Sequence, residues 1–258
     1  MSSRPVVLVT GAARRMGRAI ALDLAGHGFD IALHYRGSAD DAAATVAQIR
    51  ALGASAESFR ADLADETACR ALVPAVVASL ERLDAVVNNA STFEYDTPET
   101  FSYAAMARHF RANTGPAVLL AQALHKHLLG CDDVGCVVNI LDQKLWNPNP
   151  DYFSYTLSKA ALHSATVMLA QAFAPTLRVC GVAPGVTLGS DMMSDDNFAA
   201  AHRLTPLQRS STPEDIARAV RFLIESPAIT GTTLLVDGGQ HLTAQPRDVA
   251  FIAQTLKN

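Results

Sequence analysis

Short runs of β-branched and other apolar residues alternate along the chain with longer stretches rich in alanine and leucine at helical spacing. The short runs predict strands at residues 6–10, 30–35, 55–60, 84–87, 136–141, 178–182 and 232–236. The longer stretches predict helices at residues 18–28, 40–52, 65–83, 98–130, 152–173 and 213–225. One of these helices contains Pro74, which lacks a backbone N–H and is expected to kink or break it.

The order of these elements predicts the fold class. Parallel strands need a crossover between them and a helix supplies it, so seven strands alternating with helices predict a parallel sheet with helices on both faces. The strand runs are apolar throughout, as buried parallel strands are. No internal repeat, low-complexity tract or linker-like gap divides the chain. We therefore expect one α/β domain over residues 1–243, followed by a C-terminal tail at residues 244–258.

Two segments fall outside the alternation. Residues 186–211 are polar, carry Met192 and Met193, and are long enough to form a substrate lid. The tail carries Phe251, Ile252 and Leu256, which would dock it on a neighbouring subunit; otherwise the tail would fray.

Composition and charge exclude several classes of protein. The chain has 258 residues, of which 49% are hydrophobic and 18% charged, and its net charge is −4. A disordered chain would be less hydrophobic and more charged, and a nucleic-acid-binding protein would be basic. No apolar run reaches the roughly 18 residues of a membrane span, and the N-terminus lacks the pattern of a secretory signal. We expect a cytoplasmic globular protein with no nucleic-acid or membrane partner.

The cysteines and histidines form no metal-ligand pattern. The four cysteines lack a Cys-x-x-Cys pair and are expected to be reduced, buried thiols; they are Cys69, Cys131, Cys136 and Cys180. His125 and His127 are two apart on a predicted helix and would point to different faces. We expect no metal site.

A glycine-bearing loop follows the first predicted strand. The run Thr10-Gly11-Ala12-Ala13-Arg14-Arg15-Met16-Gly17 separates that strand from a helix. Glycines let the backbone approach a pyrophosphate, and the helix N-terminus faces its negative charge. Many loops between a strand and a helix contain two glycines and bind nothing, so the run by itself leaves a plain structural turn open.

Tyr155 and Lys159 are the first candidates for acid–base chemistry. They are four residues apart in a predicted helix and so share a face. A phenol has a pKa near 10, and a neighbouring ammonium would lower that pKa and bring proton transfer within reach. The same spacing is often just a helix surface. The chain has only four lysines, however, so a lysine in this position favours the catalytic interpretation.

Five motifs in order then carry a family resemblance. The loop at 10–17, Asn88-Asn89-Ala90, Tyr155-x-x-x-Lys159, Pro184-Gly185 and Val236-Asp237-Gly238-Gly239 resemble those of the short-chain dehydrogenase/reductases, over residues 4–243. The resemblance implies a doubly wound Rossmann-type fold with strand order 3-2-1-4-5-6-7. It also implies a dinucleotide cofactor and a homotetramer that buries the helices at about 100–130 and 152–173. Asn113 stands where the family has its proton-relay asparagine.

The resemblance also implies a set of cofactor contacts. Besides Tyr155 and Lys159 these are Gly11, Arg14, Arg15, Met16, Gly17, His34, Tyr35, Arg36, Ser38, Asp62, Leu63, Asn89, Ala90, Ser91, Pro184 and Gly185. Asp62 resembles the residue of the family that contacts the adenine, although a cap at the start of the following helix would equally explain an aspartate there.

The end of the second predicted strand bears on which cofactor is used. The run His34-Tyr35-Arg36-Gly37-Ser38 has no acidic residue to accept a hydrogen bond from a ribose 2′-hydroxyl. A carboxylate would repel a 2′-phosphate, whereas arginine, histidine and serine can donate to one. The run therefore favours NADPH over NADH, with a solvated turn as the alternative.

Three departures from the general family pattern coincide. Arg15 replaces the middle glycine of the loop, and His34-Tyr35-x-x-Ser38 follows the second strand. Asp142 stands thirteen residues before Tyr155, where the family has its catalytic serine. All three resemble the pteridine reductase branch, which includes the bacterial dihydromonapterin reductases. A pterin is reduced at a ring C=N bond, so its proton goes to nitrogen, and a carboxyl group could relay that proton better than a hydroxyl. A specialised site in a non-catalytic relative would also explain Asp142.

The same branch implies substrate contacts. Ser91 and Phe93, in Asn89-Ala90-Ser91-Thr92-Phe93, would contact and stack on a pterin, and Tyr152 falls at a further pterin-site position. The implied substrate-binding residues are Arg15, Ser91, Phe93, Asp142, Tyr152 and Tyr155. Phe93 could instead be an ordinary loop aromatic, and Arg15 could contact cofactor phosphate alone.

Three functions are therefore weighed. The first is an NADPH-dependent pteridine, dihydromonapterin or dihydrofolate reductase with Asp142, Tyr155, Lys159 and Asn113 as catalytic residues. The second is a short-chain dehydrogenase/reductase acting on another carbonyl or alcohol, against which Asp142 and Arg15 argue. The third is a non-catalytic nucleotide-sensing protein on the same fold, against which the complete Tyr–Lys–Asn set argues.

Overall fold

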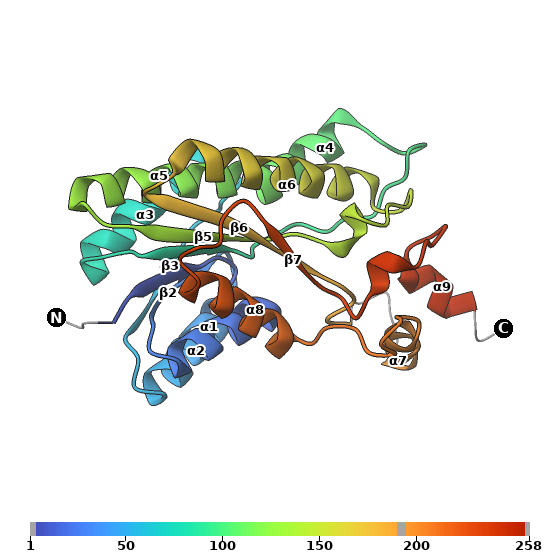
Figure 1. Ribbon diagram of the computed structural model, residues 1–258, viewed down its shortest axis with the longest axis horizontal. Helices are drawn as coiled ribbons and strands as arrows, with labels where there is room; N and C mark the ends of the chain where they lie inside the picture. Colours follow the sequence, from blue (N-terminus) through green and yellow to red (C-terminus); the bar gives the residue numbers. More distant parts are fainter. Residues whose placement is uncertain (1–3, 190–194, 256–258) are drawn as a thin grey trace.

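A single parallel sheet organises the molecule (Figure 1). The computed structural model describes residues 4–189 and 195–255. The strands are β1 (Val6–Val9), β2 (Asp30–Tyr35), β3 (Ala56–Arg60), β4 (Ala85–Asn88), β5 (Gly135–Ile140), β6 (Leu177–Pro184) and β7 (Thr233–Val236). They pair in parallel in the order β3-β2-β1-β4-β5-β6-β7. The predicted fold class and strand order are confirmed.

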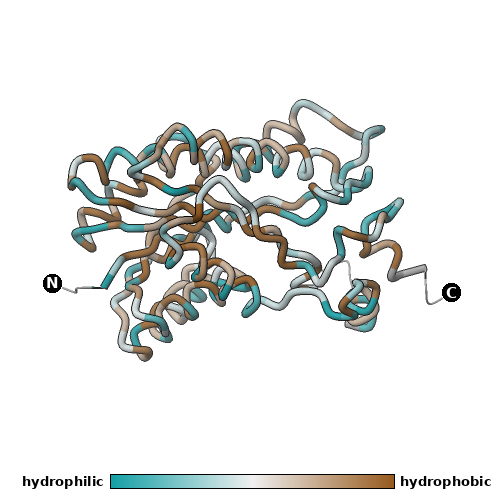
Figure 2. Tube along the Cα trace, in the orientation of Figure 1, coloured by the Kyte–Doolittle hydropathy of each residue, from teal (hydrophilic) through white to brown (hydrophobic). Residues whose placement is uncertain are grey.

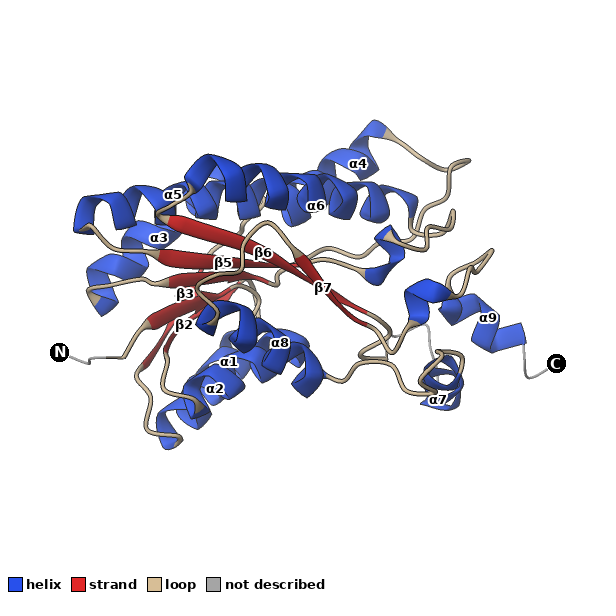
Figure 3. Cartoon of the chain, in the orientation of Figure 1, coloured by secondary structure: helices blue, strands red, loops and turns tan. Residues whose placement is uncertain are grey.

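Helices cover both faces of the sheet (Figure 3). One layer comprises α1 (Arg15–Gly26), α2 (Ala39–Ala51) and α8 (Pro213–Glu225), and the other comprises α3 (Glu66–Leu80), α5 (Gly115–Cys131) and α6 (Phe153–Phe173). Three shorter helices, α4 (Tyr103–His109), α7 (Asp195–Arg203) and α9 (Val249–Thr255), lie beyond the sheet edge at which the strands end. This leaves the carboxyl ends of the central strands framed by loops and short helices.

The two-faced strands explain the two hydrophobic cores. Successive strand residues point to opposite faces, so Val7 and Val9 pack with α1, α2 and α8, while Val6 and Leu8 pack with α3 and α5. All four side chains are buried. In Figure 2 the hydrophobic stretches of the chain gather on the strands between the two helix layers. Continuous apolar runs in the sequence are therefore what a sheet covered on both faces requires.

The structure corrects the prediction that Pro74 breaks its helix, and a kink there stays a prediction. Helix α3 runs without interruption from Glu66 to Leu80 with Pro74 inside it. The ring removes the hydrogen bond that the carbonyl of Arg70 would have accepted. Both residues are exposed, so water can satisfy that carbonyl and the helix persists.

The helix predicted at 98–130 is also corrected. It begins only at Tyr103, after Ser102, whose side chain accepts a hydrogen bond from the backbone N–H of Ala105. A π-helical turn at Phe110–Thr114 then separates α4 from α5. Such turns insert one residue into the helical ladder and often mark functional positions. Here the turn carries Asn113.

Other expectations have mixed outcomes. Cys69, Cys136 and Cys180 are buried free thiols as expected, but Cys131 is exposed, because α5 ends at that residue. The tail does not fray over residues 249–255, because α9 packs against α7 of the same chain, and its docking on a neighbouring subunit stays a prediction. Leu256, Met192 and Met193 lie outside the described residues. Among the described residues, no helix is both long and apolar enough to cross a membrane.

Candidate active site

A large cavity opens at the carboxyl ends of the strands. Its volume is about 1120 Å³. Except for Asn113, every residue predicted for the site lines it: Gly11, Arg14, Arg15, Met16, Gly17, His34, Tyr35, Arg36, Ser38, Asp62, Leu63, Asn89, Ala90, Ser91, Phe93, Asp142, Tyr152, Tyr155, Lys159, Pro184 and Gly185. Ligands of doubly wound sheets bind at this edge. The tertiary structure thus brings residues from 11 to 185 to one place.

The glycine-bearing loop forms the floor of one half of the cavity. A Cβ on Gly17 would lie 2.3 Å from the carbonyl oxygen of Gly11, so no side chain fits there. Arg15 keeps the left-handed backbone that a glycine would adopt easily, with φ 54°. The loop is tied to β4, because the Thr10 hydroxyl accepts hydrogen bonds from the N–H groups of Asn89 and Ala90 (2.9 and 3.0 Å).

His34 supports this loop. Its Nδ1 accepts a hydrogen bond from the N–H of Gly11 (3.1 Å), and its Nε2 lies 3.1 Å from the carbonyl of Ala61. The first contact requires an unprotonated Nδ1, so the neutral tautomer carries its proton on Nε2 and donates it to Ala61. Burial lowers the pKa of His34, which agrees with a neutral ring. With both nitrogens engaged, His34 positions the loop, and the expectation that it donates to a 2′-phosphate is corrected.

The end of β2 retains other donors. Tyr35, Arg36 and Ser38 line the cavity, and Ser38 precedes α2 without a capping hydrogen bond from its side chain. Asp62 also lines it and accepts a hydrogen bond from the N–H of Ala64 (3.0 Å). The cap of α3 is Asp65 rather than Asp62, so the capping alternative for Asp62 falls away.

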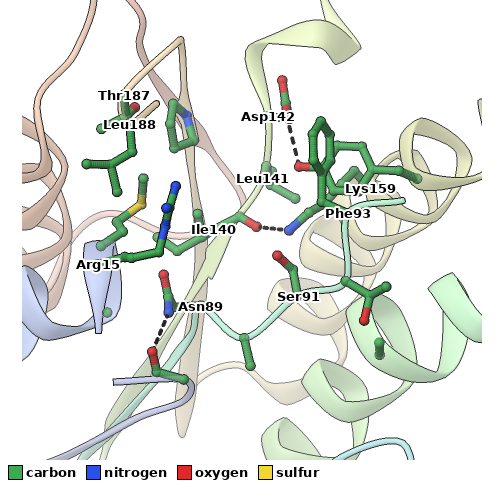
Figure 4. Close-up of a pocket in the computed structure, with 18 of the residues that line it drawn as sticks. Arg15, Asn89, Ser91, Phe93, Ile140, Leu141, Asp142, Lys159, Thr187 and Leu188 are labelled. Atoms are coloured by element: carbon green, nitrogen blue, oxygen red, sulfur yellow. Dashed lines mark hydrogen bonds between the residues drawn. The ribbon is translucent and has the colours of Figure 1, made fainter. Parts of the chain in front are cut away.

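The other half of the cavity holds the acid–base residues (Figure 4). The Tyr155 hydroxyl donates a hydrogen bond to Asp142 Oδ2 (2.9 Å). Lys159 Nζ donates to the carbonyl of Ile140 (2.7 Å) and lies 5.7 Å from the centroid of the Tyr155 ring. Asp142 follows β5, whereas Tyr155 and Lys159 lie on the first turns of α6. The spacing of four within one helix therefore works together with a carboxyl group from another element.

The electrostatics of this group differ from the expectation that Lys159 lowers the tyrosine pKa. Burial, together with the neighbouring Asp142 carboxylate, raises the pKa of Tyr155 well above its usual value. Burial likewise raises the pKa of Asp142, and it lowers the pKa of Lys159 to about 8. The correction has a geometric cause: the Tyr155 hydroxyl faces Asp142, while the ammonium is bonded to Ile140. Tyr155 and Asp142 therefore stay protonated to higher pH than the free side chains, whereas Lys159 gives up its proton more readily.

Asn113 lies behind the cavity wall. Its amide Nδ2 donates to the carbonyl of Thr92 and to Ser158 Oγ (3.0 Å each), and its Oδ1 accepts from the N–H of Thr92 (2.7 Å). The side chain thereby fixes the loop after β4 to helix α6. In this arrangement it positions Thr92 and its neighbours, and a role in proton relay stays a prediction.

Aromatic rings form a shelf beside the acid–base group. Phe93 stacks on Tyr152, with centroids 4.1 Å apart and planes 18° apart, and meets the edge of Tyr155 at 4.6 Å. Phe93 is 49% exposed, although it belongs to the cavity lining. A large aromatic left open in a cavity is suited to stacking on a flat ligand.

The predicted lid segment reaches the cavity at its start. Val186, Thr187 and Leu188 line the cavity, and Figure 4 shows Thr187 and Leu188 across it from Asp142. Arg15 Nη2 donates to the carbonyl of Gly189 (2.7 Å). The segment is not one loop, because α7 occupies part of it. Its role as a lid stays a prediction.

Sequence reasoning missed several residues near the site. Asp248, Val249 and Ala250 of the tail line the cavity, and Lys144 is buried against Asp248. Nothing in the local pattern places residue 248 beside residue 144. No group of three or more His, Cys, Asp or Glu side chains within the described ranges is placed to hold a metal ion.

Comparison with known proteins identifies the family. A family model described as enoyl-(acyl carrier protein) reductase matches residues 11–241. The chain belongs to the short-chain dehydrogenase/reductase family. It is therefore an oxidoreductase. The catalytic roles of Asp142, Tyr155 and Lys159 stay a prediction.

Similar proteins cover nearly the whole chain. A solved structure of FolM alternative dihydrofolate reductase 1 from Brucella suis, in complex with NADP, is 42% identical with a TM-score of 0.90, covering 95% of this chain and 98% of that one. Pteridine reductase 1 of Leishmania tarentolae is 34% identical, covering 93% of this chain and 97% of the relative. The 3-oxoacyl-[acyl-carrier-protein] reductase of Synechocystis is 33% identical, covering 91% and 96%.

Proposed function

We propose that this protein is an NADPH-dependent reductase of a ring C=N bond in a pterin, a dihydropterin or dihydrofolate. The observation that carries the proposal is the hydrogen bond from Tyr155 to the carboxyl group of Asp142, beside the open aromatic shelf of Phe93 and Tyr152. The likeness to FolM of Brucella suis and to pteridine reductase 1 supports it.

The residues present fit NADPH. The loop at 11–17 excludes a side chain at Gly17 and leads into the N-terminus of α1, which suits a pyrophosphate. Arg36 and Ser38 would hold a 2′-phosphate at the end of β2, where no carboxylate would repel it. The chemistry that the cofactor supplies when bound is a hydride for the ring carbon. We expect Ser38→Asp to weaken the binding of NADPH far more than that of NADH in fluorescence titrations; equal weakening of both would remove the argument.

The side chains would deliver the proton to the ring nitrogen. Tyr155 is the donor in reach of the cavity, and its raised pKa keeps its hydroxyl protonated at neutral pH. Asp142 accepts the hydrogen bond of that hydroxyl, and its own raised pKa lets it hold and return a proton. Lys159 fixes the end of β5 through the carbonyl of Ile140. Together they supply one proton for each hydride transferred.

We also propose a homotetramer in the cytoplasm, as the family resemblance implies. Exposed apolar side chains on α5 and α6 support an interface there: Leu129, Leu157, Val167 and Met168. Light scattering coupled to gel filtration measures the mass directly. A monomer at micromolar concentration would contradict the tetramer and leave the enzymatic proposal standing.

A substrate screen tests the function. Oxidation of NADPH and of NADH is followed with dihydromonapterin, dihydrobiopterin, dihydrofolate and a set of ketones and acyl thioesters. Turnover of at least one pterin or folate with NADPH is expected, and Tyr155→Phe should reduce it by roughly 10²-fold, as loss of a general acid does. Turnover of ketones or thioesters alone would replace the proposal with a carbonyl reductase, which the likeness to 3-oxoacyl reductases would then explain.

A further inference from the structure

The C-terminal residues 243–251, here called the tail segment, lie along the loop that joins β5 to α6. Near its start, Asn147 Nδ2 donates to the carbonyl of Thr243 (2.5 Å), and the N–H of Gln245 donates to Asn147 Oδ1 (3.4 Å). The tail segment and this loop are about a hundred residues apart in sequence. Their contacts therefore depend on the fold and not on any local motif.

Two ion pairs hold the tail segment to this loop. Arg247 donates from Nε and Nη2 to the two carboxylate oxygens of Asp151 (2.8 and 2.9 Å). Lys144 Nζ lies 3.1 Å from Asp248 Oδ2 and donates to the carbonyl of Asp151 (2.6 Å). The side chains of Asp151 and Lys144 are only 2% and 4% exposed. Two cations and two anions balance, so neither buried charge is left uncompensated.

Aromatic contacts extend the attachment to the shelf. The Phe251 ring lies 5.4 Å from that of Tyr95 and 6.4 Å from that of Tyr152, centroid to centroid. The Tyr95 hydroxyl donates to Asp151 Oδ1 (3.2 Å). The tail segment therefore reaches Tyr152, on which Phe93 also stacks.

The loop between β5 and α6, which the tail segment contacts, carries a residue of the candidate site at each of its two ends. Asp142 stands at its beginning and Tyr152 at its end, three residues before Tyr155. The N–H of Lys144 donates to Asp142 Oδ1 (2.9 Å), so the residue that anchors the tail also orients the carboxyl group. Asp248 completes the wall together with Val249 and Ala250, because all three line the cavity.

We propose that the tail segment is a wall of the substrate site of its own chain, with Arg247 and Lys144 as positioning residues for the loop that bears Asp142 and Tyr152. The ligand that this wall fits is a flat heterocycle lying against the shelf, so the inference rests on the proposed function for its substrate class.

Three variants test the proposal. Arg247→Ala removes the bidentate contact, Arg247→Lys restores a cation without the planar fork, and a chain ending at Thr243 removes the wall altogether. Arg70→Ala is the matched control, because Arg70 forms an exposed ion pair with Glu66 (2.7 Å) on α3 and does not line the cavity. NADPH affinity is measured by titration, and kcat and KM on whichever substrate of the screen the unaltered protein turns over best.

The expected result is selective. Arg247→Ala and the truncated chain should raise KM by at least tenfold and lower kcat, with NADPH affinity within twofold of the unaltered protein. Arg247→Lys should recover part of the loss, and Arg70→Ala should change nothing. Trp146, the only tryptophan, lies on the loop between β5 and α6 and is 37% exposed. Acrylamide should therefore quench its fluorescence more strongly in Arg247→Ala and in the truncated chain than in the unaltered protein.

Two outcomes separate the inference from the proposed function. Unchanged KM and unchanged Trp146 quenching in the truncated chain would overturn the role of the tail segment, even if pterins are substrates. An unaltered protein that reduces ketones but no pterin would refute the proposed function, while the same kinetics on the ketone would still decide whether the tail segment is a wall. The fluorescence measurement needs no turnover and decides the attachment if no substrate of the screen reacts.

Discussion

Replacing Asp142 by asparagine removes the ionisable proton of the carboxyl group and keeps the size and shape of the side chain. The amide has the size of the carboxyl group. Its single oxygen can still accept the hydrogen bond that the N–H of Lys144 donates to Asp142 Oδ1 (2.9 Å), while its NH2 replaces Oδ2 and can donate to the oxygen of the Tyr155 hydroxyl, 2.9 Å away. It has no acidic proton to hold or return. Folding and NADPH binding should therefore be preserved, and only the delivery of the proton should suffer.

The size of the effect follows from these contacts. Loss of acid–base assistance costs roughly 10²-fold or more in turnover, which is about 3 kcal/mol of transition-state stabilisation. Asp142→Ser would in addition draw the acceptor away from Tyr155, and a hydrogen bond to a charged group contributes about 1.5–3 kcal/mol. We therefore expect Asp142→Asn to be about 10²-fold slower than the unaltered protein and Asp142→Ser to be slower still.

The pH dependence of kcat/KM tests whether Asp142 supplies the proton. Burial raises the pKa of Asp142, so its protonated form is the one present at low pH, and it is lost as pH rises through that raised value. If the protonated form supplies the ring nitrogen, kcat/KM is level at low pH and falls at higher pH. This fall should vanish in Asp142→Asn. Activity of the variant within threefold of the unaltered protein, with the fall still present, would refute the assignment.

Further predictions concern the cofactor loop and the buried lysine. Gly17→Ala would place a Cβ 2.3 Å from the Gly11 carbonyl oxygen, so NADPH binding should fall by roughly 10²-fold in titrations, about 3 kcal/mol; Gly26→Ala, on the same helix with nothing within 4 Å, is the control and should bind normally. Arg15→Gly should relieve the left-handed backbone and stabilise the protein by up to about 1 kcal/mol in urea unfolding, while raising substrate KM; a loss of stability would contradict the strain. Burial lowers the pKa of Lys159 to about 8, below its value in the unfolded chain. Between these two pKa values the unfolded chain binds more protons than the folded one, so the free energy of unfolding should rise by about 2 kcal/mol from about pH 7 to pH 9.5. Lys159→Met should lack that rise, and equal slopes for both proteins would exclude the effect.

The fold was predictable from the sequence because its causes are local. A run such as Val6–Val9 is apolar on both sides, and that pattern persists only in a strand covered on both faces. One failure had its cause in the tertiary structure. Pro74 is tolerated because the carbonyl it leaves unpaired is exposed, and exposure depends on what packs against α3 and not on the residue itself.

The candidate site was predictable to the extent that single motifs carry it. The spacing of Tyr155 and Lys159 ensured a shared helix face, and the glycine-bearing loop indicated a phosphate site. The hydrogen-bond partner of each polar side chain was not predictable. Burial and the neighbouring Asp142 carboxylate raise the pKa of Tyr155, where the sequence led us to expect a fall, and Lys159 donates to the carbonyl of Ile140.

The sequence by itself determined the order of strands and helices, the family and the residues that meet at the strand ends, since periodicity and short motifs specify these through neighbouring positions. Only the tertiary structure decided that His34 supports the loop from beneath, that Asn113 faces away from the cavity, and that Asp248 lies against Lys144. The reason is physical. Each of these choices depends on a hydrogen bond or ion pair between residues 23 to 104 positions apart, and the partner of a polar group at that separation is set by packing.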